Sequence, residues 1–499
     1  MLVEYAQQNT DWPGALCGSA RTSNQPYFAR CAPIEWGAWA GGAPAKRRHL
    51  TKARSILARG ADCSRKAAAV SFASGLVVAH RSDVGMRRTT NQDSLALLVA
   101  DTPQLYETRG HLLMVADGMG AHAAGELASK LATDNVPHLY HKYRDQSPPE
   151  ALQRAIREAN AEIHRRGMAS PDFHNMGTTA SVLVLLPQGA LAAHVGDSRI
   201  YRLRGQTLEQ LSFDHSLQWE LKATGQLPEG SDLAAVVPKN VITRSLGPNA
   251  TVQIDMEGPF EIAVGDVFLV CSDGLTGRVE DVELGAILSC VPPEEAARAL
   301  VDLANLRGGP DNSTAIIARV AGPEAATATS GAEPLRLGGS RGLAAVHPAV
   351  WIIAGVCLLV GLVAAAMQLW LAAIVAVGGA VLAGAIGLVQ RFGGLPGGTA
   401  LGRGRMLGRG PYTSVQCPPS HALALKLAAT LDELREAASD GRWSIHWRPI
   451  DDACERAAGA DEAGNFAEAT RQYCRGITLM MAELRNQPEK KGGDSALQH

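Results

Sequence analysis

Val115–Glu126 reads VADGMGAHAAGE and places one aspartate between an apolar run and a series of very small residues. The preceding HLLMV predicts a buried strand, and the following AAGELASKLATDNV predicts a helix. Asp117 and Gly118 are therefore expected where a strand ends, a common place for functional side chains. An Asp-Gly pair is also an ordinary turn, so this stretch alone does not distinguish a site from a turn.

The region around this stretch, residues 76–320, alternates strand-like with helix-like runs. The runs GLVVAH, SVLVLL, RIYRL and VFLVC are short and rich in Val, Leu and Ile, which favours strands. In SPPEALQRAIREANAEI, Ser147 is placed as an N-cap, Pro148 in the first turn and Glu150 in the capping-box position. The run PPEEAARALVDLANL repeats this design from Pro292. We expect a mixed α and β unit whose hairpin-like strands form antiparallel sheets.

Length and composition limit the class of protein. A chain of 499 residues predicts more than one folded unit. Its formal net charge is only -2, so no overall field favours a nucleic-acid partner. The nine cysteines are odd in number and include no CxxC pair, which favours a reducing, cytoplasmic-type environment and disfavours a zinc site. The N-terminus lacks a secretory signal pattern, so export is not expected.

The rest of the chain divides by composition. We predict a poorly ordered extension over residues 1–75, a linker over 321–348, an uncharged hairpin over 349–390, a second linker over 391–419 and a small helical module over 420–490. The module contains AGNFAEATRQYCRGITLMMAEL, which looks like half of a tetratricopeptide-type hairpin. A small helical interaction module is the modest expectation for this end of the chain.

The hairpin region contains no Asp, Glu, Lys, Arg or His over residues 349–390. Because about 20 apolar residues cross a bilayer, this run predicts a two-helix transmembrane hairpin over about 349–367 and 370–390. Arginines flank it on both sides, which places both flanks in the cytoplasm by the positive-inside rule. We therefore expect a two-pass protein of the inner (cell) membrane that contacts membrane lipid. A buried hairpin of a soluble protein is the alternative.

Five aspartates beside glycine, serine or asparagine follow or precede strand-like runs in the middle unit. They are Asp93 in TTNQDS, Asp117 in VADGMG, Asp197 in HVGDSR, Asp273 in LVCSDG and Asp311 in GGPDNST. If the fold gathers these carboxylates, their mutual repulsion in a partly dry site requires cations. Oxygen-only ligands select hard divalent ions such as magnesium or manganese.

These motifs and their order along the chain are similar to those of a known protein family. The stretches SDVGMRRTTNQD, VADGMGAHAAGE, MGTTASVLVL, AHVGDSRIYRL, FDHSL, VITRSLG, LVCSDGL and GGPDNST resemble, in sequence and order, the PPM family of metal-dependent protein serine/threonine phosphatases, in the bacterial form of its type 2C class. The resemblance covers about residues 77–320, roughly half of the chain. It implies a fold of two packed antiparallel sheets flanked by helices, an α-β-β-α sandwich.

The resemblance also implies a centre for two Mn²⁺ or Mg²⁺ ions. Asp117 would bridge both ions, and Gly118 would offer its backbone carbonyl to one of them, because a glycine leaves room for that approach. Asp273 and Asp311 would complete the other ion's ligands. Asp93 would hold metal-bound water. The two ions would activate a water molecule for direct attack on the phosphoryl group, without a phosphoenzyme.

Three further positions follow from the resemblance. Asp197 resembles the ligand of a third, weaker ion in bacterial members, and Asn240 lies near another contact to that ion. Arg88, five residues before Asp93, takes the place of the family's phosphate-binding arginine, whose planar guanidinium pairs with two phosphate oxygens. Its neighbour Arg87 is out of register for this role.

Two positions depart from the family pattern. Gln92 stands where many members have glutamate, so metal affinity is expected to be somewhat lower. Animal members have histidine directly after Asp-Gly, whereas this chain has Met119 there and a histidine at His122. His122 is the candidate general acid that protonates the departing serine oxygen. A helix-capping or structural histidine fits the same position.

These observations predict a membrane-anchored, cytoplasm-facing enzyme that hydrolyses phosphoserine and phosphothreonine in proteins. Its expected partners are those phosphoproteins and a membrane-bound serine/threonine kinase that produces them. The alternative is a catalytically inactive phosphoprotein-binding scaffold or membrane-linked signalling adaptor, with the C-terminal helices as its working surface. That alternative is disfavoured because Asp117, Gly118, Asp273 and Asp311 are all present.

Overall fold

A computed structural model describes residues 70–71, 75–120, 123–227, 237–238, 241–328, 335–337, 348–392, 399–401, 407–441 and 443–486. The chain divides into two units, Met1–Arg65 and Lys66–His499. All described residues belong to the second unit. The extension predicted over residues 1–75 therefore lies almost wholly outside the described residues.

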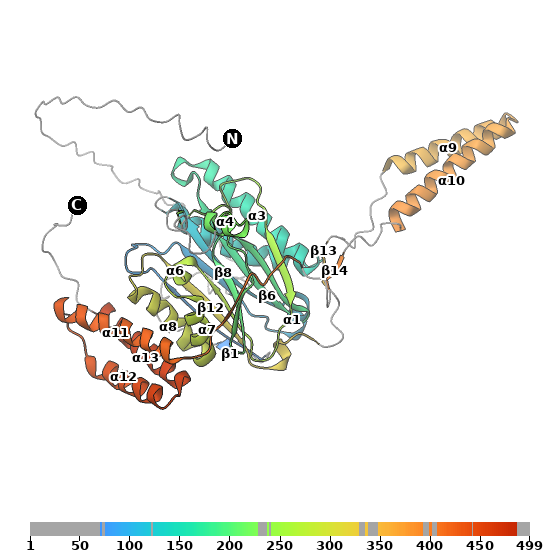
Figure 1. The fold of residues 1–499 in the computed structure, drawn as a ribbon. Helices are drawn as coiled ribbons and strands as arrows, with labels where there is room; N and C mark the ends of the chain where they lie inside the picture. Colours follow the sequence, from blue (N-terminus) through green and yellow to red (C-terminus); the bar gives the residue numbers. More distant parts are fainter. Residues whose placement is uncertain are drawn as a thin grey trace, which may run out of the picture. The chain divides into compact units, whose positions relative to one another are not determined.

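Two antiparallel sheets form the centre of this unit (Figure 1). The first sheet has the order β1 (Val70–Ser71), β2 (Leu76–Asp83), β12 (Ser313–Val320), β11 (Val267–Cys271), β8 (Arg199–Arg204), β9 (Thr207–Gln210) and β15 (Thr413–Gln416). The second has the order β10 (Asp255–Phe260), β7 (Gly189–Val195), β6 (Ala180–Leu186), β4 (His111–Met119) and β3 (Asp93–Leu98), with β5 (Gly177–Thr178) beside β4.

Strand β4 shows why its sequence is apolar throughout. Successive side chains of a strand point to opposite faces. Leu112 and Met114 lie in the core beneath the helices that cover the second sheet. Leu113 and Val115 lie in the core between the two sheets. Because both faces of β4 are buried, the run HLLMV has no polar alternation.

Helices cover the outer face of each sheet (Figure 1). The second sheet is covered by α2 (Ala124–Lys142) and α3 (Pro148–Ala169), and the first by α7 (Asp281–Cys290) and α8 (Pro293–Leu306). Among the described residues, shorter helices are α1 (Pro103–Arg109), α4 (Leu217–Ala223) and α6 (Asp273–Thr276). The capping box predicted for α3 is present, with Ser147 and Glu150 as its members. The predicted α-β-β-α sandwich is confirmed.

Residues 349–390 fall into two helices, α9 (Pro348–Ala366) and α10 (Trp370–Phe392), which lie side by side (Figure 1). The prediction that they form a transmembrane hairpin is wrong. A bilayer crossing needs one helix with about 20 consecutive apolar residues. Within the described residues, no helix combines sufficient length with sufficient apolarity to make that crossing. The predicted cellular location is not tested by the structure.

The chain flanking this helix pair forms a two-stranded sheet and then rejoins the sandwich. Strands β13 (Leu335–Leu337) and β14 (Thr399–Leu401) pair in antiparallel register. Further on, the backbone N–H groups of Arg409 and Gly410 each donate to the buried Glu257 carboxylate at 2.9 Å. Strand β15 then pairs with β9. Part of the segment predicted as a linker therefore supplies an edge strand of the first sheet.

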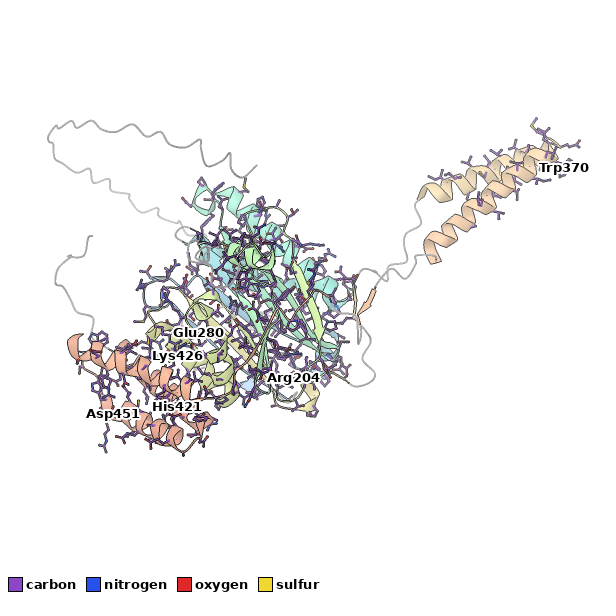
Figure 2. All side chains as sticks on the ribbon, in the orientation of Figure 1. Arg204, Glu280, Trp370, His421, Lys426 and Asp451 are labelled. Carbon is purple, nitrogen blue, oxygen red and sulfur yellow. The ribbon has the colours of Figure 1, made fainter. Side chains whose placement is uncertain are left out.

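The C-terminal helices are α11 (His421–Gly441), α12 (Trp447–Glu462) and α13 (Phe466–Arg485). Their apolar side chains, including Leu427 and Ile477, share one core with α7 and α8. An ion pair supports the contact, because Lys426 Nζ of α11 lies 2.9 Å from Glu280 Oε2 at the start of α7 (Figure 2). The C-terminal module is thus a further helical layer on the first sheet's side of the sandwich.

Candidate active site

The β3–β4 pair brings together two of the predicted site residues. Asp93 begins β3 and lies directly opposite Asp117 of β4. Directly opposite residues of an antiparallel pair place their side chains on the same face. The N–H of Asp117 donates to Thr179 Oγ1 at 2.8 Å, which holds the end of β4 in place. The two carboxyls are therefore neighbours because of strand register.

Gly118 occupies a position with no room for a side chain. A Cβ at this residue would lie 2.1 Å from the carbonyl oxygen of Gly125 and 2.6 Å from that of Gln92. The N–H of Gly118 donates to this Gln92 carbonyl at 3.1 Å. The start of α2 thus packs directly on the strand backbone. This close approach requires glycine at Gly118 and Gly125.

Strand ends deliver the other three predicted aspartates to the same place. Asp273 lies two residues after β11 as the first residue of α6, Asp197 lies between β7 and β8, and Asp311 precedes β12. The charges of Asp93, Asp273 and Asp197 all act on Asp117, and Asp311 acts on both Asp93 and Asp273. The structure therefore gathers all five aspartates into one electrostatic group, which we call the aspartate cluster.

The aspartate cluster binds protons unusually tightly. Burial raises the pKa of Asp117 well above its ordinary value, and the charges of Asp93, Asp273 and Asp197 raise it further. Burial raises the pKa of Asp93 to about 7 and that of Asp197 to about 8. Burial also raises the pKa of Asp273. The site thus stabilises positive charge, whether it comes from protons or from cations.

Three carboxylate oxygens of the aspartate cluster indicate whether it could bind cations. Oδ1 of Asp93, Asp197 and Asp273 are buried and have no hydrogen-bond partner. Buried polar atoms are normally paired, so these oxygens face positions that the protein itself does not fill. Mg²⁺ and Mn²⁺ prefer oxygen ligands. The residues present therefore fit divalent cations.

Few carboxylates of the aspartate cluster lie close enough together to bind one metal ion. In the part of the chain that the structure describes, no three His, Cys, Asp or Glu side chains converge closely enough to hold a metal ion by themselves. Asp117 and Asp273, however, are close enough for each carboxyl to shift the pKa of the other. Mg²⁺ is commonly held by one or two carboxylates together with several waters. Asp117 and Asp273 are two such carboxylates.

Hydroxyl groups that the sequence analysis did not single out hold Asp93. Ser272 Oγ and Thr314 Oγ1 each donate to Asp93 Oδ2 at 2.7 Å. These bonds oppose the effect of burial and lower the pKa of Asp93. Both hydroxyls belong to motifs that contain predicted aspartates, LVCSDG and GGPDNST. Their proximity in sequence to those aspartates could have identified Ser272 and Thr314 as site residues.

Asn312 is a second residue that the sequence analysis missed. Its side-chain Nδ2 donates to the carbonyl oxygens of Val84 and Thr90, at 2.8 and 3.0 Å, and its Oδ1 accepts the N–H of Gln92 at 2.8 Å. The amide thereby joins the chain around Asp311 to both ends of the segment that carries the predicted phosphate-binding arginine. The signal was its position next to Asp311 in PDNST.

Arg88 lies at the exposed side of the cluster. Its NH2 donates to Asp311 Oδ2 at 2.9 Å, and half of its side chain, 50%, is exposed. An arginine carries five N–H donors in a planar fork, so one bond to a carboxylate leaves the group suited to an anionic ligand. Arg87 is exposed. The proposed general acid His122 and the position Asn240 lie outside the described residues.

Comparison with known proteins identifies the family. A family profile described as Protein phosphatase 2C matches residues 86–303. Protein phosphatase PhpP of Streptococcus pneumoniae is 36% identical over 238 residues, which make up 47% of this chain and 93% of PhpP. The chain belongs to the PPM family. It is therefore a metal-dependent serine/threonine protein phosphatase, as the motif order predicts.

Further relatives of the phosphatase are similar over the same share of its chain. Serine/threonine phosphatase stp of Listeria monocytogenes is 34% identical over 245 residues, 48% of this chain and 93% of stp. The solved structure of Mycobacterium tuberculosis PstP/Ppp is 33% identical, with a TM-score of 0.42, and covers 50% of this chain and 99% of its own. A catalytic domain of PstP solved with 2 manganese ions is 33% identical, with a TM-score of 0.41 and coverages of 50% and 99%. These matches span about half of the phosphatase.

Proposed function

We propose that the phosphatase hydrolyses phosphoserine and phosphothreonine in proteins at the aspartate cluster, with two Mn²⁺ or Mg²⁺ ions as cofactors. The observation that carries this assignment is the set of three buried carboxylate oxygens without a protein partner. When bound, the ions supply Lewis-acid activation of water and offset the charge that develops at the attacked phosphoryl group.

The carboxylates have separate tasks in this proposal. Asp117, Asp273 and Asp311 would hold the two ions together with the backbone carbonyl of Gly118. Asp93 lies beside these three aspartates and is oriented by two hydroxyl donors at 2.7 Å. Its Oδ1 can accept a hydrogen bond from a water molecule at the site. Asp197 is the ligand of a third, more weakly bound ion.

Arg88 is the proposed phosphate-binding residue. Its guanidinium is half exposed at the edge of the cluster, so a phosphorylated side chain can reach it from solvent. Pairing with Asp311 orients the fork toward the cluster. Binding two phosphate oxygens there would hold the phosphorus close to the carboxylates. The general acid for the leaving serine or threonine oxygen stays a prediction, with His122 as the candidate.

The chemistry also indicates the kind of partner. Hydrolysis consumes phosphoserine and phosphothreonine, and only a protein kinase of matching specificity produces them. We therefore propose that a serine/threonine protein kinase and its substrates are the physiological counterparts of this phosphatase.

A metal-dependence assay tests the proposal. The full-length chain is incubated with a phosphothreonine peptide and Mn²⁺, and phosphate release is measured for the parent, Asp117→Asn and Asp134→Asn. Asp134 is a matched control because its carboxylate lies on α2 and is 64% exposed. We expect activity in the parent and control and loss of at least about 100-fold in Asp117→Asn. Activity that persists with EDTA would contradict the metal mechanism.

A binding measurement separates the enzyme from an inactive scaffold. In titration calorimetry with Mn²⁺, the parent and Asp134→Asn are expected to bind the ion, and Asp117→Asn is expected to bind it more weakly. A chain that binds a phosphothreonine peptide, takes up no Mn²⁺ and releases no phosphate would instead be the scaffold.

A further inference from the structure

The last helix of the chain is built into the phosphatase domain. Helix α13 packs along α8, and Ile477 and Met480 of α13 lie in the same buried core as residues of α7 and α8. The family profile ends at residue 303, so this helix lies beyond the part of the chain that defines the family. Its contacts therefore belong to features of this chain that the family does not explain.

The final residue of α13, Arg485, bridges two acidic side chains of the phosphatase domain. Its NH2 donates to Asp83 Oδ2 at 2.7 Å and to Asp302 Oδ1 at 3.0 Å. The side chain of Asp302 is 4% exposed and that of Asp83 is 15% exposed, whereas Arg485 is 35% exposed. Charge-assisted bonds to poorly solvated carboxylates are stronger than surface ion pairs. The bridge is thus a well-defined contact at the end of the module.

Asp83 in turn organises the loop that leads to Arg88. It is the last residue of β2, and its Oδ1 accepts the N–H of Gly85 at 3.1 Å and the Nδ2 of Asn305 at 3.0 Å. One carboxylate thereby ties β2, the loop and α8 together. Arg485 binds the other oxygen of this carboxylate, so it helps to set the orientation of the group that holds the loop.

The loop has little freedom to move without disturbing the site. A Cβ on Gly85, whose φ is +83°, would lie 2.3 Å from the carbonyl oxygen of Asp311. Met86 N donates to the carbonyl of Gly309 at 2.8 Å. The loop therefore rests directly on the segment that carries Asp311, and Arg88 then pairs with that aspartate. Backbone contacts thus connect the loop that follows Asp83 with the segment to which Arg88 is bonded.

We propose that Arg485 is a positioning residue for phosphate binding, acting through Asp83 and the loop that carries Arg88. Without its guanidinium, Asp83 and Asp302 are two neighbouring carboxylates whose charges repel. Asp83 then keeps Arg81, at 3.5 Å, as its nearest cationic partner, and the carboxylate turns away from the geometry that holds Gly85. The C-terminal module thus contributes to the substrate site without touching the substrate.

The inference rests on the proposed function and is tested by steady-state kinetics on the full-length chain. The substrate is a phosphothreonine peptide in the presence of Mn²⁺, and KM, kcat and inhibition by inorganic phosphate are measured. In Arg485→Ala we expect KM and the phosphate inhibition constant to rise roughly three- to tenfold. We expect kcat to stay within about twofold, because Arg88 holds phosphate before and during reaction alike.

A matched control separates positioning from simple docking of the helix. Arg471 also lies on α13 and is 43% exposed, and its NH2 donates to the backbone carbonyl of Cys290 at 2.9 Å, at the end of α7. Arg471→Ala removes a contact of the same helix that has no link to the loop, so KM is expected to stay within about twofold of the parent. Arg485→Lys keeps the charge and is expected to give a KM between those of the parent and Arg485→Ala.

The outcomes distinguish the two proposals. A parent chain with no Mn²⁺-dependent activity contradicts the proposed function. An active parent with equal KM values in Arg485→Ala and Arg471→Ala overturns the positioning role and leaves Arg485 as a structural contact. If Arg485→Ala does not fold, Arg485→Met, which keeps most of the packing and removes the donors, decides the matter. A raised KM in Arg485→Met supports the role, and an unchanged KM overturns it.

Discussion

Asp93→Asn is expected to stabilise the metal-free phosphatase while it weakens catalysis. Burial raises the pKa of Asp93 from an ordinary 3.8 to about 7. At about 1.4 kcal/mol per pKa unit, an ionised Asp93 costs the folded chain up to about 4 kcal/mol. Asparagine removes this charge, and its Oδ1 can still accept from Ser272 and Thr314. Its Nδ2 can donate to the neighbouring carboxylates of the cluster.

The effect has a defined pH window. The folded-state pKa lies above the unfolded-state value, so the folded parent loses stability as pH rises from about 4 to about 7 and remains destabilised above that range. The advantage of Asp93→Asn in EDTA should therefore be small at pH 4.5 and reach its full size, about 1 to 4 kcal/mol, at pH 8. Denaturant unfolding at the two pH values measures this difference.

The control and the catalytic readout complete the experiment. Asp134→Asn makes the same chemical change at a carboxylate that is 64% exposed, and its stability should stay within about 0.5 kcal/mol of the parent at both pH values. With Mn²⁺ present, Asp93→Asn should lose about 10- to 100-fold in activity or in apparent Mn²⁺ affinity. The reasoning is refuted if Asp93→Asn in EDTA is no more stable than the parent at pH 8, or gains equally at both pH values.

Three further predictions concern other parts of the site. Gly118→Ala should destabilise the fold, since its Cβ would lie 2.1 Å from the Gly125 carbonyl oxygen; a loss above about 2 kcal/mol in denaturant unfolding is expected, and an unchanged midpoint would contradict this. Arg88→Ala should raise KM for a phosphothreonine peptide about tenfold or more, and equal KM values would remove its assigned role. Burial raises the pKa of Asp302 to about 6, so between pH 4 and 6 Asp302→Asn should lose about 2 kcal/mol less stability than the parent; parallel stability curves would contradict this.

The sandwich and its aspartates were predictable because their signals are local. The strands β4, β6 and β11 contain short apolar runs, and Asp117, Asp197 and Asp273 each lie within two residues of the end of a strand, namely β4, β7 and β11. Since strands of a packed sheet end along a common edge, side chains after several strands meet. The membrane prediction relied on the absence of charged residues over 349–390, whereas a crossing requires length and apolarity together in one helix, and no helix among the described residues combines them.

Long-range contacts could not be predicted in the same way. Ser272 and Thr314, which orient Asp93, lie 179 and 221 residues from it in the sequence. Arg485 lies 402 residues from Asp83. Periodicity places such residues on a helix face or at a strand end but does not say which surface they meet. Only the tertiary structure shows that the C-terminal helices pack on α7 and α8.

The paired strands β13 and β14 lie on either side of α9 and α10 in the sequence, so these helices form an insertion whose two ends meet. Leu337 pairs with Thr399, and Leu335 with Leu401, so the chain leaves and returns through adjacent strands. Residues 338–398 could then be exchanged for a short turn joining the two strands, with only a small entropic cost of closure. The enzyme would keep its route to β15 and to Arg485. Replacing this insert is therefore expected to leave the aspartate cluster unchanged.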